Sequence, residues 1–269
     1  MRLLVKLATV LSLVFSQVFA QDFNAGLKAY KSGDYKAAFN EWKPLADQGD
    51  AIAQSALGVM YQNGEGISQD NKEAVKWYQL SAEQGYAASQ YKLGVMYSYG
   101  YGVLKDELNA IIWYQKAAEQ GYASAQYNLG VIYSSGIGVS RDDKEAVKWY
   151  LLAADQGNAS AQHNLGAIYI RGSGVTKDNT EGVKWYRLSA EQGNASAQYT
   201  LGLMYFQGTI VLQDNLTSHM WFNISSANGD KKAGINRDAI TSIMTPADIS
   251  KATAMARECM KSGYKKCGY

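Results

Sequence analysis

A serine and a lysine three residues apart are the closest approach of this sequence to an enzymatic motif. Ser89 and Lys92 have the Ser-x-x-Lys spacing in which lysine activates a serine nucleophile for acyl transfer, and Ser262 and Lys265 repeat it. The Ser-Asp-Asn and Lys-Thr-Gly segments that accompany this chemistry are absent from the sequence. Ser89 also stands where other copies of the repeat described below carry alanine, which indicates a small interior residue. We therefore expect no enzymatic activity.

The residues that could bind a metal or a phosphate are badly placed for either task. The two histidines, His163 and His219, lie far apart and have no cysteine partners, so they do not make a zinc site. Gly-x-Gly pairs such as Gly136 and Gly138 are not followed by Lys-Ser or Lys-Thr, and no strand precedes them. We expect no metal or other cofactor, and we expect His219 to be a packed helix residue, because its equivalents are valine or isoleucine.

The chain has two cysteines, Cys259 and Cys267, close together near its C-terminus. In an exported chain this pair predicts a disulfide that pins the C-terminal tail. The alternative is a catalytic thiol, which would need a nearby histidine and a helix N-terminus, and neither is evident.

Residues 1–20 have the pattern of a secretory signal peptide. Arg2 and Lys6 provide the positive start, residues 7–15 are apolar but too short to span a bilayer, and small residues precede a cleavage site after Ala20. The alternatives are a membrane anchor and a buried helix. No later segment is apolar enough to cross a membrane, so we expect a periplasmic or secreted protein in an oxidising compartment.

Composition excludes several classes of protein. The chain has 269 residues, with 26 Lys and Arg against 24 Asp and Glu, so there is no basic footprint for nucleic acid. The hydrophobic fraction of 47% and charged fraction of 19% exclude an intrinsically disordered chain. The 26 glycines against two prolines predict helices that end at glycine, provided that the glycines are periodic.

Four motifs recur every 36 residues in constant phase, which is the signature of a repeat architecture. They are Leu-Gly at Leu57-Gly58, Leu93-Gly94, Leu129-Gly130, Leu165-Gly166 and Leu201-Gly202; Tyr at Tyr61, Tyr97, Tyr133, Tyr169 and Tyr205; Trp at Trp77, Trp113, Trp149, Trp185 and Trp221; and Gln-Gly at Gln48-Gly49, Gln84-Gly85, Gln120-Gly121, Gln156-Gly157 and Gln192-Gly193.

The first half of each copy predicts a helix with a core-facing stripe. In the third copy Ala125, Leu129 and Tyr133 share one face at intervals of four residues. Gly130 lies beside that stripe, and a glycine inside a helix costs about 1 kcal/mol, so we expect it to permit close approach of a second helix.

The second half of each copy predicts a second helix. Gly136 can adopt the left-handed conformation that ends the first helix, and Gly157 ends the second. Asp142 and Glu145 have capping-box spacing, in which the aspartate accepts from the backbone and the glutamate reaches back to the N-cap amide. Asp70 with Glu73 and Asp178 with Glu181 repeat the motif.

A hairpin this short buries its apolar face only by stacking on its neighbours, so the predicted fold is an all-α, right-handed α-solenoid of 36-residue helix-turn-helix repeats with a C-terminal capping helix. The expected parts are the signal peptide 1–20; a divergent N-terminal helical hairpin, 21–50; five repeats, 51–86, 87–122, 123–158, 159–194 and 195–230; and a C-terminal helical cap, 231–269, with its helix at Pro246 to Met260. We expect a monomer.

These motifs resemble the Sel-one-like repeat (SLR) proteins, whose pattern includes Leu-Gly, Tyr, Gly-x-Gly-Val, Trp-Tyr and Gln-Gly. The resemblance covers residues 22 to about 230 and weakens in the fifth copy, where Ile210, Ser218 and Phe222 depart from the pattern. It implies an adaptor that binds a protein or peptide. The alternative that it implies is β-lactam binding or hydrolysis, credited to a cysteine-rich branch whose cysteine pair in every repeat is missing here.

In solenoids of paired helices the first helix of each pair lines the concave surface, where we expect the partner to bind. An aromatic series lies on the face of these helices opposite the core stripe, and its members are large, amphipathic and low in conformational entropy. The predicted anchors are Tyr91, Tyr127, His163 and Tyr199, which follow Ser55 in the same repeat position, together with Tyr99, Arg171 and Phe206 at the ends of the helices. The alternative is that these rings pack between neighbouring repeats.

Overall fold

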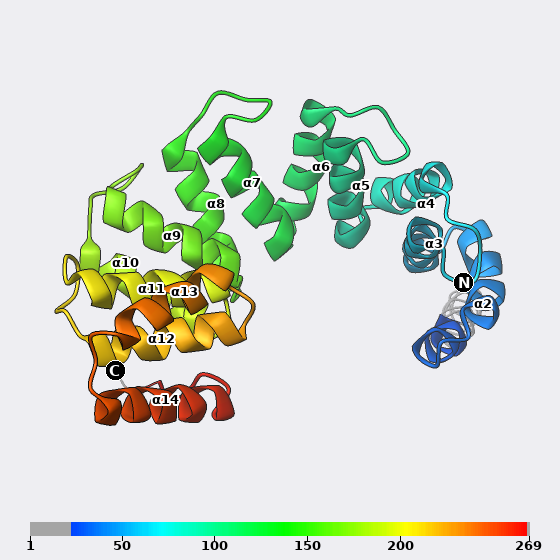
Figure 1. Ribbon diagram of the computed structural model, residues 1–269. Helices are drawn as coiled ribbons and strands as arrows, with labels where there is room; N and C mark the ends of the chain where they lie inside the picture. Colours follow the sequence, from blue (N-terminus) through cyan, green and yellow to red (C-terminus); the bar gives the residue numbers. More distant parts are fainter. Residues whose placement is uncertain (1–22, 268–269) are drawn as a thin grey trace, which may run out of the picture. The chain divides into compact units, whose positions relative to one another are not determined.

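The structure is a computed structural model that describes residues 23–267, and within this range it consists of helices and connecting turns without strands (Figure 1). The predicted signal peptide and its cleavage site after Ala20 lie outside the described residues. None of the helices in the described range is long and apolar enough to cross a membrane. The predicted all-α solenoid class is confirmed.

The helices come in pairs, as the 36-residue period predicts. After a helix at 23–31 they are α2 (Tyr35–Asp47), α3 (Ala51–Asn63), α4 (Asn71–Glu83), α5 (Ala87–Tyr99), α6 (Glu107–Glu119), α7 (Ala123–Ser135), α8 (Asp143–Asp155), α9 (Ala159–Arg171), α10 (Asn179–Ala190), α11 (Ala195–Gln207), α12 (Asn215–Ala227), α13 (Lys231–Thr241) and α14 (Pro246–Lys261).

The chain divides into two compact units, Met1–Ala125 and Gln126–Tyr269. In both units a first helix packs on the second helix of its own repeat. The glycine of Leu-Gly makes this possible. A Cβ atom on Gly94 would lie 2.7 Å from the Tyr114 ring in the first unit, and one on Gly166 would lie 2.6 Å from the Tyr186 ring in the second. The expectation that this glycine permits close helix approach is confirmed.

The second helices begin at aspartate caps, but the capping box is only half formed. Asp142 accepts hydrogen bonds from the amides of Lys144 and Glu145, as predicted. The amide of Asp142 donates instead to the carbonyl of Tyr133, 2.9 Å away, at the end of the preceding helix. Glu145 therefore pairs with Lys148 at the surface. The predicted return bond of the glutamate is wrong, because the loop already satisfies the N-cap amide.

A ladder of buried glutamines joins neighbouring repeats, and the sequence analysis did not identify it. In the second unit Gln162 is 5% exposed, and its Nε2 donates to the carbonyl of Ala154 in the preceding repeat. Its Oε1 accepts from Nε2 of Gln192, the glutamine of Gln-Gly, at 2.6 Å. Because a buried polar group costs about 1–3 kcal/mol if it loses its partner, these bonds fix the spacing between repeats.

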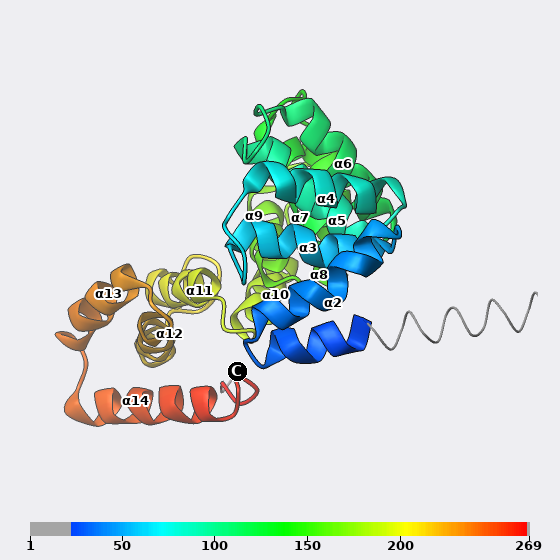
Figure 2. The same cartoon turned by 90° about the vertical axis from the view of Figure 1, so that its right-hand side faces the viewer.

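The C-terminal region contains a second helix that the sequence analysis missed. α13 begins 36 residues after α11, and its N-cap Asp230 accepts from the amides of Lys232 and Ala233. It buries Ala233 and Ile240 next to Phe222 of α12. α14 follows and packs Ala256 and Cys259 against the core around Trp221, so α13 and α14 both lie against α12 (Figure 2). The expected capping helix is present, and α13 is an additional helix that covers α12.

Candidate partner-binding surface

Tyr91, the first ring of the predicted aromatic series, is half-buried in the first unit. Tyr91 of α5 lies with its ring centroid 5.9 Å from that of Tyr114, the second-helix tyrosine of the same repeat. Its other neighbour is Tyr122, at 5.1 Å, in the turn before α7. Burial raises the pKa of Tyr91, so its phenol is neutral near pH 7.

The three anchors in the second unit repeat this geometry. Each ring in the series is half-buried and rests on the ring of the second helix of its own repeat. The pairs are Tyr127 with Tyr150 at 6.0 Å, His163 with Tyr186 at 5.2 Å and Tyr199 with Phe222 at 5.8 Å between centroids. Each anchor therefore keeps one part of its surface accessible while the other part is held in place.

Charge is scarce along this series in the second unit. Burial lowers the pKa of His163 below its ordinary value of 6.5; the bond to Asn164 opposes this shift, and the positive charge of Arg171 adds to it. Burial also raises the pKa of Tyr186 to about 12. At pH 7 His163 therefore presents a neutral ring to a partner.

The residues predicted at the ends of the first helices are more exposed. The side chain of Tyr99 is 66% exposed and stacks on Tyr101 at 5.5 Å between centroids. Arg171 is exposed at the last position of α9. Phe206 is 39% exposed at the end of α11, in the second unit.

Phe206 borders an apolar hollow of about 270 Å³ in the second unit. Leu203 of α11 and Phe222 of α12 form one side, and Ile240 of α13 with Ile243 after it forms the other. The sequence analysis missed this hollow because it missed α13. The available signal was the 36-residue interval from Asn194, which caps α11, to Asp230.

A second hollow, of about 240 Å³, lies in the first unit between the helix at 23–31 and α3. Phe23, Leu27 and Tyr30 line it from the first helix, and Trp42 lines it from α2. On the other side it is lined by α3 and the turn after α4, at Ile52, Ser55, Ala56, Val59 and Tyr86.

The residues that suggested enzymatic or metal chemistry have structural surroundings. Ser89 is fully buried in α5, so a substrate cannot reach its hydroxyl. Ser262 Oγ donates to the carbonyl of Cys259 and accepts from the amide of Lys266. His219 is 3% exposed, as expected of a packed helix residue. Within residues 23–267 no group of three or more His, Cys, Asp or Glu side chains could hold a metal.

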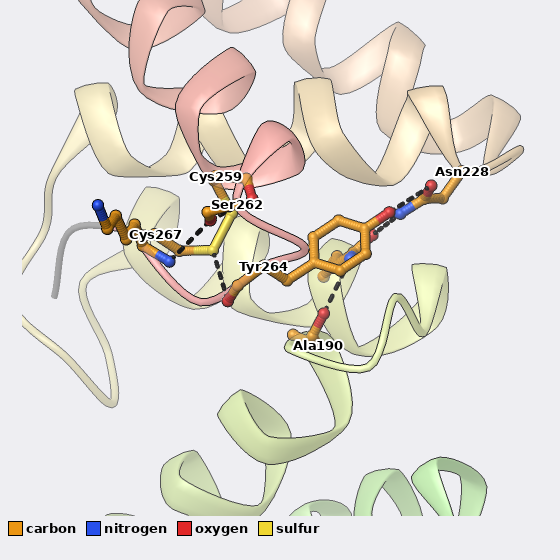
Figure 3. Close-up of a disulfide and its surroundings, with 8 residues drawn as sticks. Ala190, Asn228, Cys259, Ser262, Tyr264 and Cys267 are labelled. Atoms are coloured by element: carbon orange, nitrogen blue, oxygen red, sulfur yellow. Dashed lines mark hydrogen bonds between the residues drawn. A yellow bond between two sulfur atoms is a disulfide. The ribbon is translucent and has the colours of Figure 1, made fainter.

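Cys259, in the last turn of α14, forms a disulfide with Cys267 after the helix, and the loop between them ends the glutamine ladder (Figure 3). Asn228, which stands where the other repeats have glutamine, donates to Gln198 Oε1 at 2.9 Å. Tyr264 lies inside the disulfide loop, and its hydroxyl donates to Asn228 Oδ1 at 3.0 Å. The disulfide thus holds the residue that occupies the last acceptor of the ladder.

Comparison with known proteins identifies the same repeats. The Sel1 repeat matches residues 51–86, 87–122, 123–158, 159–194 and 195–230. A crystal structure of a Sel1 repeat protein from Oxalobacter formigenes is 31% identical with a TM-score of 0.77, over 88% of this chain and 99% of that one. A protective antigen of uropathogenic Escherichia coli that displays an SLR fold is 26% identical, over 91% of this chain and 70% of that one, with a TM-score of 0.38.

One curated relative is the "Exopolysaccharide production negative regulator" of Rhizobium leguminosarum bv. viciae, which is 39% identical over 56 residues. That match spans 21% of this chain and 21% of the relative, so only about a fifth of the relative is covered. The five matched repeats occupy more than half of the chain, and the Oxalobacter structure matches it over nearly its whole length. The chain therefore belongs to the Sel1 repeat family, whose members are typically protein-interaction scaffolds.

Proposed function

We propose that this protein is an exported adaptor that holds a protein or peptide partner against the first helices of its repeats. One observation carries the proposal: each ring of the series is half-buried on a second-helix ring and keeps the remaining surface accessible. A ring held in place loses little conformational entropy when a partner binds, and it offers a large apolar area.

The spacing of the anchors suits a peptide or a helix. Packed helices lie about 8–10 Å apart, so the three anchors of α7, α9 and α11 span about 20 Å. That span corresponds to about six residues of extended chain or four turns of helix. The apolar hollow beside Phe206 adjoins the last ring of the series, Tyr199. Leu203, one helical turn after Tyr199, and Phe222 connect the two.

The test compares capture of a partner from an envelope extract by purified variants. Tyr127→Ala combined with Tyr199→Ala is expected to abolish capture, since central interface anchors typically lose about 2 kcal/mol or more each on truncation. Lys148→Ala is the matched control, because Lys148 is an exposed residue of the same unit whose partner is Glu145. It is expected to leave capture unchanged.

The fold of each variant is checked by circular dichroism. Loss of the helical signal in the double variant would mean that the two tyrosines serve the core. Tyr99→Ala, at a position 66% exposed, then provides the binding test without a folding cost. A folded double variant that captures the same partner as the wild type would contradict the proposal.

Export is the second part of the proposal, and it rests on the signal-peptide pattern of residues 1–20. The intact mass of the protein recovered from the envelope fraction tests it. We expect a chain that begins at Gln21. A chain that retains Met1 would contradict both the export and the oxidising compartment.

A further inference from the structure

The aromatic series has one gap, at Ser55 in the first unit. Phe23 begins the series, because it stacks on Trp42 at 5.4 Å between centroids and lies three residues before Gly26, the glycine against that ring. Tyr91 has the same relation to Gly94 and Tyr114 in the second repeat. In the first repeat Gly58 contacts the Tyr78 ring, and the residue three positions earlier is Ser55, which has no ring.

The 240 Å³ hollow described above lies at this gap, with Ser55 in its wall. Phe23, the previous ring of the series, forms part of the same wall. Tyr86 forms another part, and it is the equivalent of Tyr122, which contacts the Tyr91 ring at 5.1 Å in the next repeat. The hollow is therefore bordered by Tyr86, whose equivalent contacts the tyrosine ring in the next repeat, where that ring is present.

Two polar side chains in the wall, Trp42 and Tyr30, have hydrogen-bond partners within the protein. Trp42 Nε1 donates to the carbonyl of Phe23 at 3.1 Å, and the Tyr30 hydroxyl donates to Glu65 at 2.6 Å. The Trp42 and Tyr30 groups are therefore already engaged and are not left to bind a charged ligand. An apolar cavity of about 150 Å³ is large enough for benzene, so this hollow has room for a phenol ring.

We propose that the hollow at Ser55 receives an aromatic side chain, tyrosine or phenylalanine, from the partner peptide and so completes the interrupted ring series. The proposal deepens the proposed function and rests on it for the origin of the ring. The rings that fill the equivalent position in the other repeats identify the occupant. The site gives the partner a fixed register, because it is the one position between Phe23 and Tyr199 where the chain supplies no ring itself.

The experiment measures binding of p-cresol, the side-chain analogue of tyrosine, to the mature chain by protein-observed NMR titration. We expect saturable binding to the wild type and equal binding to Ser55→Ala, which keeps the hollow open. Ser55→Tyr places in the first repeat the ring that Tyr91 places in the second, so it is expected to fold and to bind p-cresol at least tenfold more weakly. 4-Methylcyclohexanol, similar in size but not aromatic, is expected to bind several-fold more weakly to the wild type.

A second variant keeps the test decisive if Ser55→Tyr does not fold. Tyr86→Ala removes one ring from the wall, and it is expected to weaken p-cresol binding at least fivefold. Unchanged p-cresol binding in both variants, each shown to be folded, would overturn the proposal. It would also be overturned if the wild type showed no saturable binding at about 10 mM p-cresol, a concentration on the order of the dissociation constant of a very weak ligand. A wild-type dimer that Ser55→Tyr converts to monomer would assign the hollow to a second copy and also overturn it.

This assay needs no partner protein. A chain that binds p-cresol but captures nothing through Tyr127 and Tyr199 would leave the hollow assigned and remove the adaptor function. A chain that captures its partner but does not bind p-cresol would leave the adaptor function standing and remove the ring site.

Discussion

Gly130 lies against Tyr150 so closely that a Cβ atom on the glycine would be 2.6 Å from ring carbons Cδ1 and Cε1. Real Cβ atoms essentially never make such contacts, so any side chain at position 130 must displace the ring or separate the two helices. The Tyr150 ring also contacts the ring of Tyr127, with 6.0 Å between the two centroids. The glycine that closes the hairpin thus sets the position of a predicted anchor.

Gly130→Ala is expected to lower the free energy of unfolding by about 1–3 kcal/mol, because overpacking at a tight contact forces backbone or ring movement. Gly136→Ala is the comparison, since φ at Gly136 is 70° and alanine there costs about 1 kcal/mol. Gly130→Val, with a larger branched side chain, is expected to be worse than either. Thermal melts give the order.

A double-mutant cycle isolates the contact. If the ring is the obstacle, Gly130→Ala is less costly in a Tyr150→Ala background than in the wild type. Equal costs in the two backgrounds, or a larger loss from Gly136→Ala than from Gly130→Val, would contradict this account of the glycine.

The fold followed from the sequence because the repeat multiplies weak local signals. A single Leu-Gly or Gln-Gly pair has many meanings, but five copies in phase admit only a stacked hairpin. The period also located Gly130 at the helix contact and His219 in the core. α13 escaped detection because Arg237 and Asp238 stand where its equivalents carry Leu-Gly, so the motif is lost although the spacing persists.

The site was less predictable because it depends on side-chain partners. Aligning the repeats of the chain with one another placed Tyr91 and Tyr127 in one series. It could not show that each ring is half-buried on a second-helix ring. The hollow at Ser55 was visible only as one departure in a column of aromatic residues. Its meaning depends on Phe23 and Trp42. These residues lie in the N-terminal hairpin, whose spacing to the first repeat is four residues shorter than the 36-residue period, so they fall outside the aligned repeats.

The pH dependence of stability should carry the signature of His163. Its pKa in the folded protein is lowered from 6.5, so the unfolded chain takes up a proton first as the pH falls. Stability from this group is therefore complete above about pH 6.5 and is lost as the pH falls below that value. His163→Tyr, which restores the residue of the neighbouring repeats, is expected to reduce the drop in melting temperature between pH 7.5 and pH 5.

His219 has a pKa lowered in the same direction by burial, and it remains in both proteins, so the comparison isolates His163. An equal or larger drop for His163→Tyr would show that the folded protein does not resist protonation at this position.

The disulfide is expected to stabilise the C-terminal end of α14. Cys259 and Cys267 are eight residues apart, and closing so short a loop contributes at most about 2–3 kcal/mol. Cys259→Ala with Cys267→Ala should lose that amount in denaturant unfolding. Tyr264→Phe keeps the disulfide and removes only the bond to Asn228, so it should lose about 0.5–1.5 kcal/mol.

Alkylation of the native, unreduced protein gives an independent check on the bond. Neither cysteine is expected to react before reduction, and both are expected to react afterwards in denaturant. Two labelled thiols in the unreduced protein would contradict the disulfide.

Site-specific photocrosslinking tests the partner-binding surface most directly. A benzophenone amino acid replaces Phe206, which is 39% exposed beside the apolar hollow, or Lys148, which is exposed in the same unit. We expect a crosslinked partner, identified by mass spectrometry, from position 206 and none from position 148. Crosslinking from position 148 with none from position 206 would contradict it.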